Sequence, residues 1–99
     1  MERNKINPSP LDELITVFSQ VDDAEAMKKL FEEIFTPAER KDLALRWQLM
    51  KMVSCKVPQR KIAAELKISL CKITRGAKVL KNPESITKNI LQKLEESQQ

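Results

Sequence analysis

The chain has very little glycine and no histidine. Its 99 residues include one glycine, Gly76. Dinucleotide-binding and Walker phosphate loops need several glycines, because backbone N–H groups must come close to the phosphates, so both fingerprints are excluded. The absence of histidine removes the Ser–His and Cys–His nucleophile pairs and most zinc sites. The many acidic residues include no carboxylate pair that stands out, so we expect neither an enzyme nor a metal site.

Cysteine and long apolar runs are also scarce. Cys55 and Cys71 lie sixteen positions apart, with no signal peptide before them, which indicates a reducing cytoplasm rather than a disulfide scaffold. No apolar run approaches the roughly 20 residues that a membrane span requires, so we expect a soluble protein. A chain this short buries only about 60 to 65% of its unfolded surface when it folds alone, so we expect it to need a partner.

Charge is segregated along the chain. Residues 1–36 carry a net charge of −4, residues 37–81 a net charge of +9 and residues 82–99 a net charge of −1. A block of positive charge this dense is typical of proteins that bind a polyanion, because neutralising phosphates releases condensed counterions. Nucleic acid is therefore the favoured partner, and a merely solvated lysine face is the alternative.

Apolar residues recur at helical spacing along the chain, and no segment alternates as a strand would, so an all-α fold is predicted. We expect a flexible head over residues 1–10 and a single helical domain over residues 11–99. The first helix should present Leu11, Leu14, Ile15, Phe18 and Val21 on one face. A second helix should run from Asp23 to Phe35.

Two segments predict helix starts because each places proline directly after a capping residue. Thr36-Pro37-Ala38-Glu39 predicts a third helix that ends near Cys55, and Asn82-Pro83-Glu84 predicts a last helix from about Pro83 to Glu95. The third helix should carry Leu43, Trp47, Met50 and Val53 inward, with Trp47 in the core. The last should carry Ile86, Ile90, Leu91 and Leu94 on its apolar face, with a fraying glutamine tail beyond.

Residues 58–81, PQRKIAAELKISLCKITRGAKVLK, have the pattern of a helix-turn-helix. Each apolar or small residue fits one role in that motif: Ile62 and Leu66 face inward, Ala63 lies at the helix crossing, Ile68 fills the turn, Ser69 caps the second helix and Ile73 anchors it. Lys67 stands where such a turn often has glycine, and a left-handed conformation there would cost about 1 to 2 kcal/mol. Helix packing without nucleic acid is the alternative, but the surrounding cations favour DNA.

The segments FTPAERKDLALRW and QRKIAAELKISLCKITRGAKVLK resemble the Trp repressor family of bacteria over about residues 35–81. The resemblance implies six helices per subunit in an intertwined homodimer. It further implies that L-tryptophan, as corepressor and with no other cofactor, fits between the core and the helix-turn-helix. The liganded dimer would then bind a near-palindromic operator in double-stranded DNA and repress genes of tryptophan biosynthesis or salvage.

The resemblance also implies a tryptophan site. Arg46 and Arg75 would hold the indole between them, with Arg75 also reaching the carboxylate. Gly76 would let the ligand approach the backbone, with a helix kink as the alternative. Backbone carbonyls near Glu33, Phe35 and Thr36 of the other subunit would meet the ammonium. Val79 stands where the family can place a serine, and about one residue is missing near Lys56, so ligand identity stays open.

By the same resemblance, nine residues would face DNA: Gln59, Arg60, Ser69, Leu70, Cys71, Lys72, Thr74, Lys78 and Lys81. Arg60 is the predicted bidentate contact to guanine, and Lys78 and Lys81 are predicted to hold phosphates. Cys71 would be a small apolar contact or an inert surface thiol. Cys55 is predicted to be packed at a helix end rather than to act as a sensor.

Two other functions remain open. One is a regulator of the same family that binds DNA without tryptophan or responds to another ligand, for which Val79 is the motive. The other is a protein-interaction module whose basic charge serves only solubility.

Overall fold

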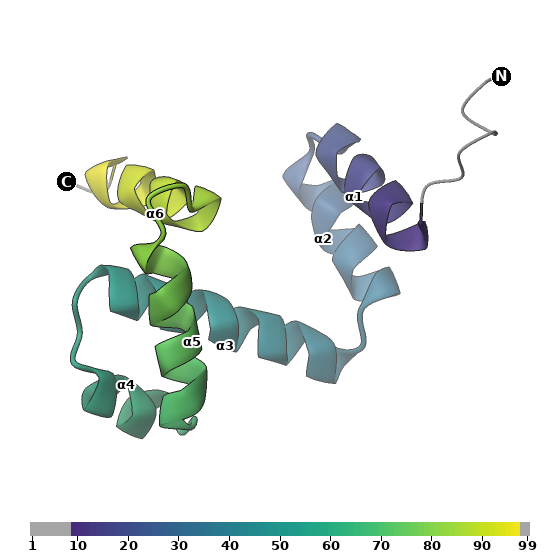
Figure 1. Ribbon diagram of the computed structural model, residues 1–99. Coiled ribbons are helices and arrows are strands. Elements are labelled where there is room, and N and C mark those ends of the chain that lie inside the picture. The colour runs from purple at the N-terminus through teal and green to yellow at the C-terminus, as the bar shows by residue number, and fades with distance from the viewer. Residues whose placement is uncertain (1–8, 98–99) are drawn as a thin grey trace, which may run out of the picture. The chain divides into compact units, whose positions relative to one another are not determined.

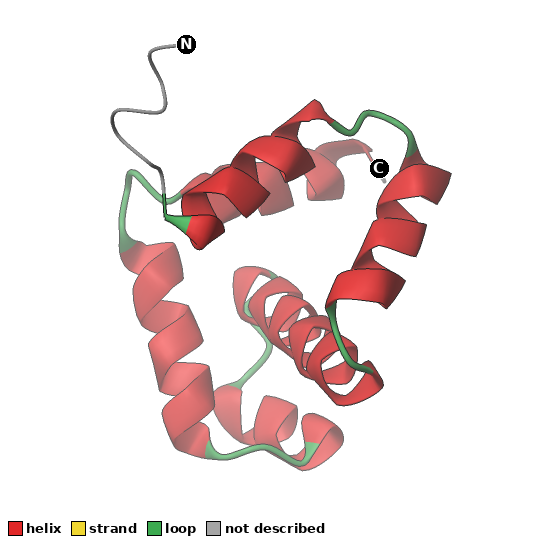
Figure 2. Cartoon of the chain, turned by 90° about the vertical axis from the view of Figure 1, so that its right-hand side faces the viewer, coloured by secondary structure: helices red, strands yellow, loops and turns green. Residues whose placement is uncertain are grey.

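The computed structural model describes residues 9–97, and every regular element in that range is an α-helix (Figures 1 and 2). The elements are α1 (Pro10–Gln20), α2 (Ala24–Ile34), α3 (Pro37–Ser54), α4 (Gln59–Leu66), α5 (Leu70–Lys81) and α6 (Ile86–Ser97). The predicted all-α fold is therefore confirmed. The chain divides into two compact units, an N-terminal unit of residues 1–40 and a C-terminal unit of residues 41–99. A single domain over residues 11–99 stays a prediction.

In the N-terminal unit, capping side chains begin both helices. Ser9 Oγ accepts a hydrogen bond from the N–H of Asp12 at 3.1 Å, so α1 begins at Pro10, inside the segment predicted to be a flexible head. Asp23 Oδ1 accepts from the N–H of Glu25 at 3.3 Å and caps α2. Residues 1–8 of the expected head, like the last two residues of the glutamine tail, lie outside the described residues.

Three phenylalanines pack α1 against α2. The ring centroids of Phe18 and Phe31 are 5.3 Å apart, and those of Phe31 and Phe35 are 5.0 Å apart. Neither helix has a buried residue, and large apolar side chains such as Leu11 and Ile15 are more than half exposed. The unit thus has an aromatic contact but no closed core of its own.

The joint between α2 and α3 is fixed by side-chain hydrogen bonds. Thr36 Oγ1 accepts from the N–H of Glu39 at 3.2 Å, and Glu39 Oε1 accepts from the N–H of Thr36 at 2.9 Å. This reciprocal pair is the capping box predicted from the sequence, and it starts α3 at Pro37. Arg40 Nη1 donates to the carbonyl oxygens of Glu32 and Phe35, which satisfies acceptors at the end of α2.

The core of the C-terminal unit joins α3 to the helix-turn-helix. Its buried residues are Leu49, Met52, Ile62 and Ile73, and the last two are fully inaccessible to solvent. Ala63, Leu66 and Ile68 pack against this cluster, as predicted. Lys67, at the position where such a turn often has glycine, adopts the left-handed conformation (φ 56°, ψ 47°) and ends α4.

The predicted inward face of α3 is confirmed for Val53, which packs against the core, and Met50 is partly buried, but the prediction is wrong for Leu43 and Trp47. Trp47 is 41% exposed and Leu43 is 37% exposed, whereas Leu49 and Met52 are buried. The reason is that α3 carries apolar residues on more than one face, so the helical period alone does not select the face that packs within this unit. Trp47 is therefore not a core residue of the subunit.

The predicted start of the last helix is also wrong. Asn82 Oδ1 accepts from the N–H of Glu84 at 2.9 Å, so Asn82-Pro83-Glu84 closes a turn rather than opening a helix. Ser85 Oγ accepts from the N–H of Lys88 at 3.0 Å, and α6 begins at Ile86. On the predicted apolar face Leu91 is buried, whereas Ile86, Ile90 and Leu94 are exposed.

Glu95 fastens α6 to the end of α3. Its Oε2 accepts from Ser54 Oγ at 2.9 Å and from Cys55 Sγ at 3.5 Å. The hydrogen bond to Glu95 raises the pKa of the Cys55 thiol, and partial desolvation adds to the rise. Cys55 was expected to be packed, but it is exposed, because α3 ends one residue before it.

Candidate functional site

A cavity of about 310 Å³ lies between α3 and α5 in the C-terminal unit. Figure 1 shows α5 crossing α3. The residues that line the cavity are Asp42, Leu45, Arg46, Leu49 and Met50 of α3, Ile68 of the turn, and Lys72, Arg75, Gly76 and Val79 of α5. On each helix they follow the i, i+3, i+4, i+7 spacing of a single face. The cavity is therefore formed by two facing helix stripes.

Gly76 is buried against side chains of α3. A Cβ atom at this position would lie 3.3 Å from Met50 Sδ and 3.5 Å from Leu49 Cδ2. The helix α5 runs unbroken from Leu70 to Lys81 through Gly76. The absence of a side chain thus lets the side chains of α3 approach the α5 backbone beside the cavity.

The cavity combines an apolar wall with segregated charge. Arg46, Lys72 and Arg75 contribute positive charge and Asp42 contributes negative charge. All four side chains are exposed to solvent, so the cavity opens to water at its charged rim. Guanidinium planes stack on aromatic faces and also pair with carboxylates. The chemistry therefore suits a small ligand with a flat apolar body and a carboxylate.

The structure brings four of the predicted tryptophan-site residues together. Arg46, Arg75, Gly76 and Val79 all line the cavity. The other three, Glu33, Phe35 and Thr36, belong to the N-terminal unit and were expected to act from a second subunit. The carbonyl of Phe35 already accepts from Arg40, and Thr36 is engaged in the capping box. Their role toward a ligand stays a prediction.

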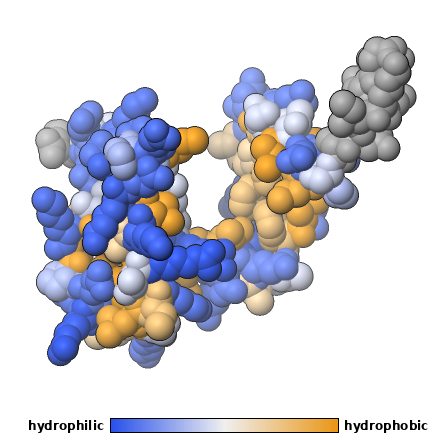
Figure 3. Space-filling view, viewed as in Figure 1, coloured by the Kyte–Doolittle hydropathy of each residue, from blue (hydrophilic) through white to orange (hydrophobic). Residues whose placement is uncertain are grey.

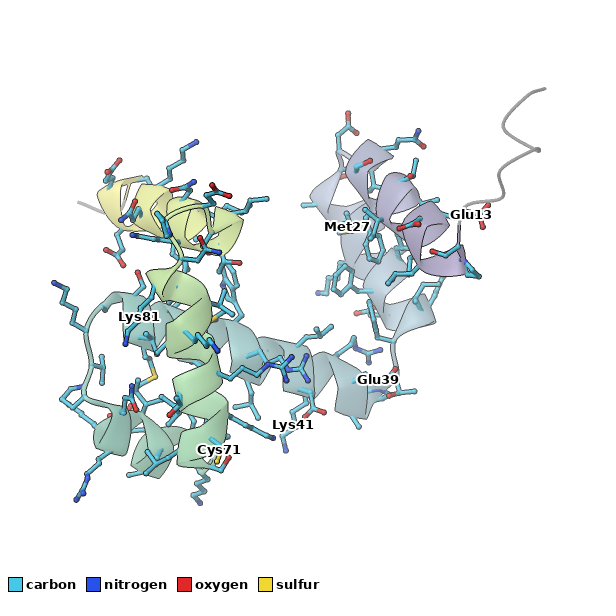
Figure 4. The ribbon with its side chains drawn as sticks, in the orientation of Figure 1. Glu13, Met27, Glu39, Lys41, Cys71 and Lys81 are labelled. Carbon is cyan, nitrogen blue, oxygen red and sulfur yellow. The ribbon has the colours of Figure 1, made fainter. Side chains whose placement is uncertain are left out.

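All nine residues predicted to face DNA are exposed. Gln59 and Arg60 are the first two residues of α4. Ser69 caps α5, its Oγ accepting from the N–H of Lys72 at 3.3 Å. Figure 4 shows Cys71 and Lys81 at opposite ends of α5, and in Figure 3 hydrophilic side chains surround hydrophobic ones in this part of the surface. The exposed side of α5 is thus free for contact with a partner.

Comparison with known proteins identifies the family. A family model for the Trp repressor protein matches residues 9–95. The chain belongs to the Trp repressor family. A Trp operon repressor homolog of Chlamydia trachomatis serovar L2 is 31% identical over 80 residues, which is 80% of this chain and 85% of the relative. A Trp operon repressor homolog of Xylella fastidiosa strain M23 is 35% identical over 65 residues, covering 65% of this chain and 71% of the relative.

No solved structure shows a significant match to this Trp repressor family member. The family model and the names of the relatives support a regulator of the Trp operon repressor type, and they confirm the resemblance seen in the sequence. None of the helices between residues 9 and 97 has the length and apolar character of a membrane span.

Sequence reasoning missed part of the cavity of this Trp repressor family member. The overlooked lining residues are Asp42, Leu45, Leu49, Met50 and Ile68, and Lys72 was assigned to DNA alone. Helical spacing contained the signal. Asp42 and Met50 lie four residues before and after Arg46, and Lys72 lies three residues before Arg75. Once the two arginines were singled out, their neighbours on the same faces were the natural candidates.

Proposed function

We propose that this protein is a homodimeric repressor that binds a near-palindromic operator when L-tryptophan occupies the cavity between α3 and α5. The observation that supports the proposal is that α5 contributes residues to the cavity and also presents residues outside the cavity to solvent. The inner side of α5 gives Arg75 and Gly76 to the cavity, while Cys71 and Thr74 on the same helix are exposed. A ligand in the cavity would therefore set the position of α5 and so of its exposed side.

The proposed ligand contacts follow from the cavity chemistry. The indole ring lies between the guanidinium planes of Arg46 and Arg75, against the apolar wall that includes Val79. Arg75 also pairs with the carboxylate. The backbone carbonyls near Glu33, Phe35 and Thr36 of the second subunit accept from the ammonium. Tryptophan acts as corepressor, and the genes controlled are those of tryptophan biosynthesis or salvage.

The proposed DNA contacts use the start of α4 and the exposed side of α5. Arg60 pairs with guanine in the major groove, and Gln59 lies beside it. Lys78 and Lys81 hold phosphates and fix the register. The remaining proposed contacts, near the first turns of α5, are Ser69, Leu70, Cys71, Lys72 and Thr74. The site acts by binding alone, without metal or enzyme chemistry, in the cytoplasm.

The apolar surface of the subunit supports dimerisation. Leu11 and Ile15 in the N-terminal unit, and Trp47, Ile86 and Ile90 in the C-terminal unit, are each between 41% and 74% exposed. Burying apolar side chains of this size stabilises an interface by roughly 1.5 to 3 kcal/mol each. An intertwined second subunit would cover these faces and supply the closed core that the N-terminal unit lacks.

Isothermal calorimetry of L-tryptophan into the full-length protein tests the ligand. We expect saturable binding near one ligand per subunit, at least tenfold weaker in Arg75→Ala. Arg60→Ala is the matched control, because it removes an exposed arginine outside the cavity and should leave the ligand affinity unchanged. Absence of heat with the unmodified protein would disprove the role of tryptophan.

DNA binding is tested separately by titrating operator-length duplex DNA at several salt concentrations with and without L-tryptophan. For each phosphate neutralised, log K should fall with log salt with a slope of about −0.9. Arg60→Ala should weaken DNA binding while leaving ligand binding intact. Affinity that does not depend on salt would favour a protein-interaction module instead.

Val79 favours a second candidate, a regulator of this family with another ligand or with none. Its side chain gives the cavity wall no hydroxyl that could accept from an ammonium. DNA affinity that is high without tryptophan, or that rises with a different aromatic acid, would select this candidate.

A further inference from the structure

The charged residues of the cavity differ in sign and number. The inference drawn from them rests on the proposed binding of an amino acid in the cavity. The cavity is lined by three cationic side chains but by one acid, Asp42. An α-amino acid carries a carboxylate and an ammonium, so a site that selects it must offer both an anion partner and a cation partner. Arg46, Lys72 and Arg75 can act only as hydrogen-bond donors toward the carboxylate. They leave the ammonium without a side-chain partner.

We propose that Asp42 is the specificity-determining residue that pairs with the ammonium of the bound amino acid, from the same subunit whose arginines hold the rest of the ligand. Asp42 lies on the same face of α3 as Arg46, four residues before it and about 6 Å away along the helix axis. An ionised carboxylate accepts hydrogen bonds at two oxygens and donates none. It is therefore suited to an ammonium and unsuited to a second carboxylate.

The composition of the opposite wall supports this role. Val79 lines the α5 side of the cavity with methyl groups, which accept no hydrogen bond from an ammonium. Burial of a charged group without a partner is strongly unfavourable. Beside the backbone carbonyls proposed from the second subunit, Asp42 is the one acidic residue of the cavity lining, so its carboxylate is the side chain suited to pair with the ammonium.

Asp42 has a simpler possible role, which is to position Arg46. An acid four residues before a base is a favourable helical pair, and removing it could disturb the guanidinium. The two roles predict different ligand dependence. A positioning role affects every ligand that uses Arg46, whereas direct pairing affects only ligands that carry an ammonium.

Calorimetry on the full-length protein separates these roles. The probes are L-tryptophan, L-phenylalanine and L-tyrosine, each paired with the corresponding 3-arylpropanoate, which lacks the amino group. The variant is Asp42→Asn, which keeps shape and removes charge. Glu65→Gln is the matched control, because Glu65 is an exposed acid of α4 in the same unit and does not line the cavity. Thermal unfolding of each variant checks that the fold is retained.

We expect Asp42→Asn to weaken an amino acid about threefold to tenfold, the upper range for an ion pair near the surface, and to change its 3-arylpropanoate by less than twofold. Glu65→Gln should change neither. An equal loss for both members of a pair, or no loss, overturns the proposal while leaving the binding of tryptophan intact. Binding of another amino acid with the same dependence on Asp42 supports it even if tryptophan fails, and failure of all probes overturns both proposals.

Discussion

The two units of the chain are stabilised in different ways. In the C-terminal unit, Ile62 and Ile73 of the helix-turn-helix are completely buried in a cluster with residues of α3. In the N-terminal unit, α1 and α2 bury no residue and are joined by a ring contact among phenylalanines. The difference indicates that the cavity-bearing unit has a core of its own, whereas the N-terminal unit leaves much of its apolar surface exposed.

The largest expected effect is in the core of the C-terminal unit. Ile73→Ala removes a side chain with no solvent exposure and leaves a cavity, so the free energy of unfolding should fall by about 2 to 5 kcal/mol. Urea unfolding followed by circular dichroism measures this. Val79→Ala, at an exposed position of the same helix, is the control and should change stability much less. Equal losses of unfolding free energy in the two variants would mean that burial of Ile73 does not stabilise this unit.

A smaller effect, dependent on protein concentration, is expected in the N-terminal unit. Ile15 is 54% exposed, so Ile15→Ser should leave a single subunit nearly unchanged but weaken the proposed dimer. The expected loss is about 1.5 to 3 kcal/mol for each buried copy. Sedimentation equilibrium measures the dimer dissociation constant. Gln20→Ser on the same helix is the polar control, and an unchanged constant in Ile15→Ser would remove α1 from the interface.

Structural features that depend on neighbouring residues can be predicted from the sequence. Thr36, Pro37 and Glu39 predict the start of α3, because the capping box involves only neighbouring residues. Ile62 and Ile73 are predictable for a related reason, since a tight turn brings two short apolar stripes together. The sequence also locates Arg46 and Arg75 in one cavity through the family resemblance.

Other features depend on interactions that a local pattern does not encode. The side chain of Asn82 can close a turn or cap a helix. Here it closes a turn, and Ser85, three residues later, caps α6. Trp47 follows the helical period yet is exposed, because α3 has apolar residues on several faces and the positions of its neighbours decide which face is buried. Asp42 was overlooked because an acid on a long helix ordinarily faces solvent.

Backbone strain further separates the two units. Among residues 9–97 the non-glycine residues with positive φ are Lys56 and Lys67, both in the C-terminal unit. Replacing Lys67 by glycine removes the strain of the left-handed conformation but increases the freedom of the unfolded chain, so we expect a net gain of about 0.5 to 1 kcal/mol. Urea unfolding measures it. Lys61→Gly, in the first turn of α4, should instead lose up to about 1 kcal/mol.

The smallest expected effect concerns the attachment of α6. The folded state raises the pKa of Cys55, mainly through the hydrogen bond to Glu95. The protonated thiol therefore stabilises the fold below the usual thiol pKa near 9.0, and this contribution is lost as the pH rises through the higher pKa of the folded state. Since Cys55 is exposed, the change should be well under about 1 kcal/mol.

Unfolding curves between pH 8 and 10 measure this contribution. The wild-type protein should lose slightly more stability over that range than Cys55→Ser does. Cys71→Ser is the control and should retain the wild-type dependence, because the Cys71 thiol makes no such contact with Glu95. Identical curves for wild type and Cys55→Ser would show that the hydrogen bond does not persist in solution.

The position of Cys71 also makes α5 accessible to chemical labelling. It is an exposed free thiol in the first turn of the helix, and Cys55 is the other cysteine of the chain (Figure 4). Replacing Cys55 by serine would leave a single attachment point without introducing a foreign residue into α5. A spin label there would report the distance between the two α5 helices of a dimer, and a tethered DNA-cleaving chelate would mark the bases beneath each one. The native Cys71 thiol is thus sufficient for measuring the position of α5 by labelling.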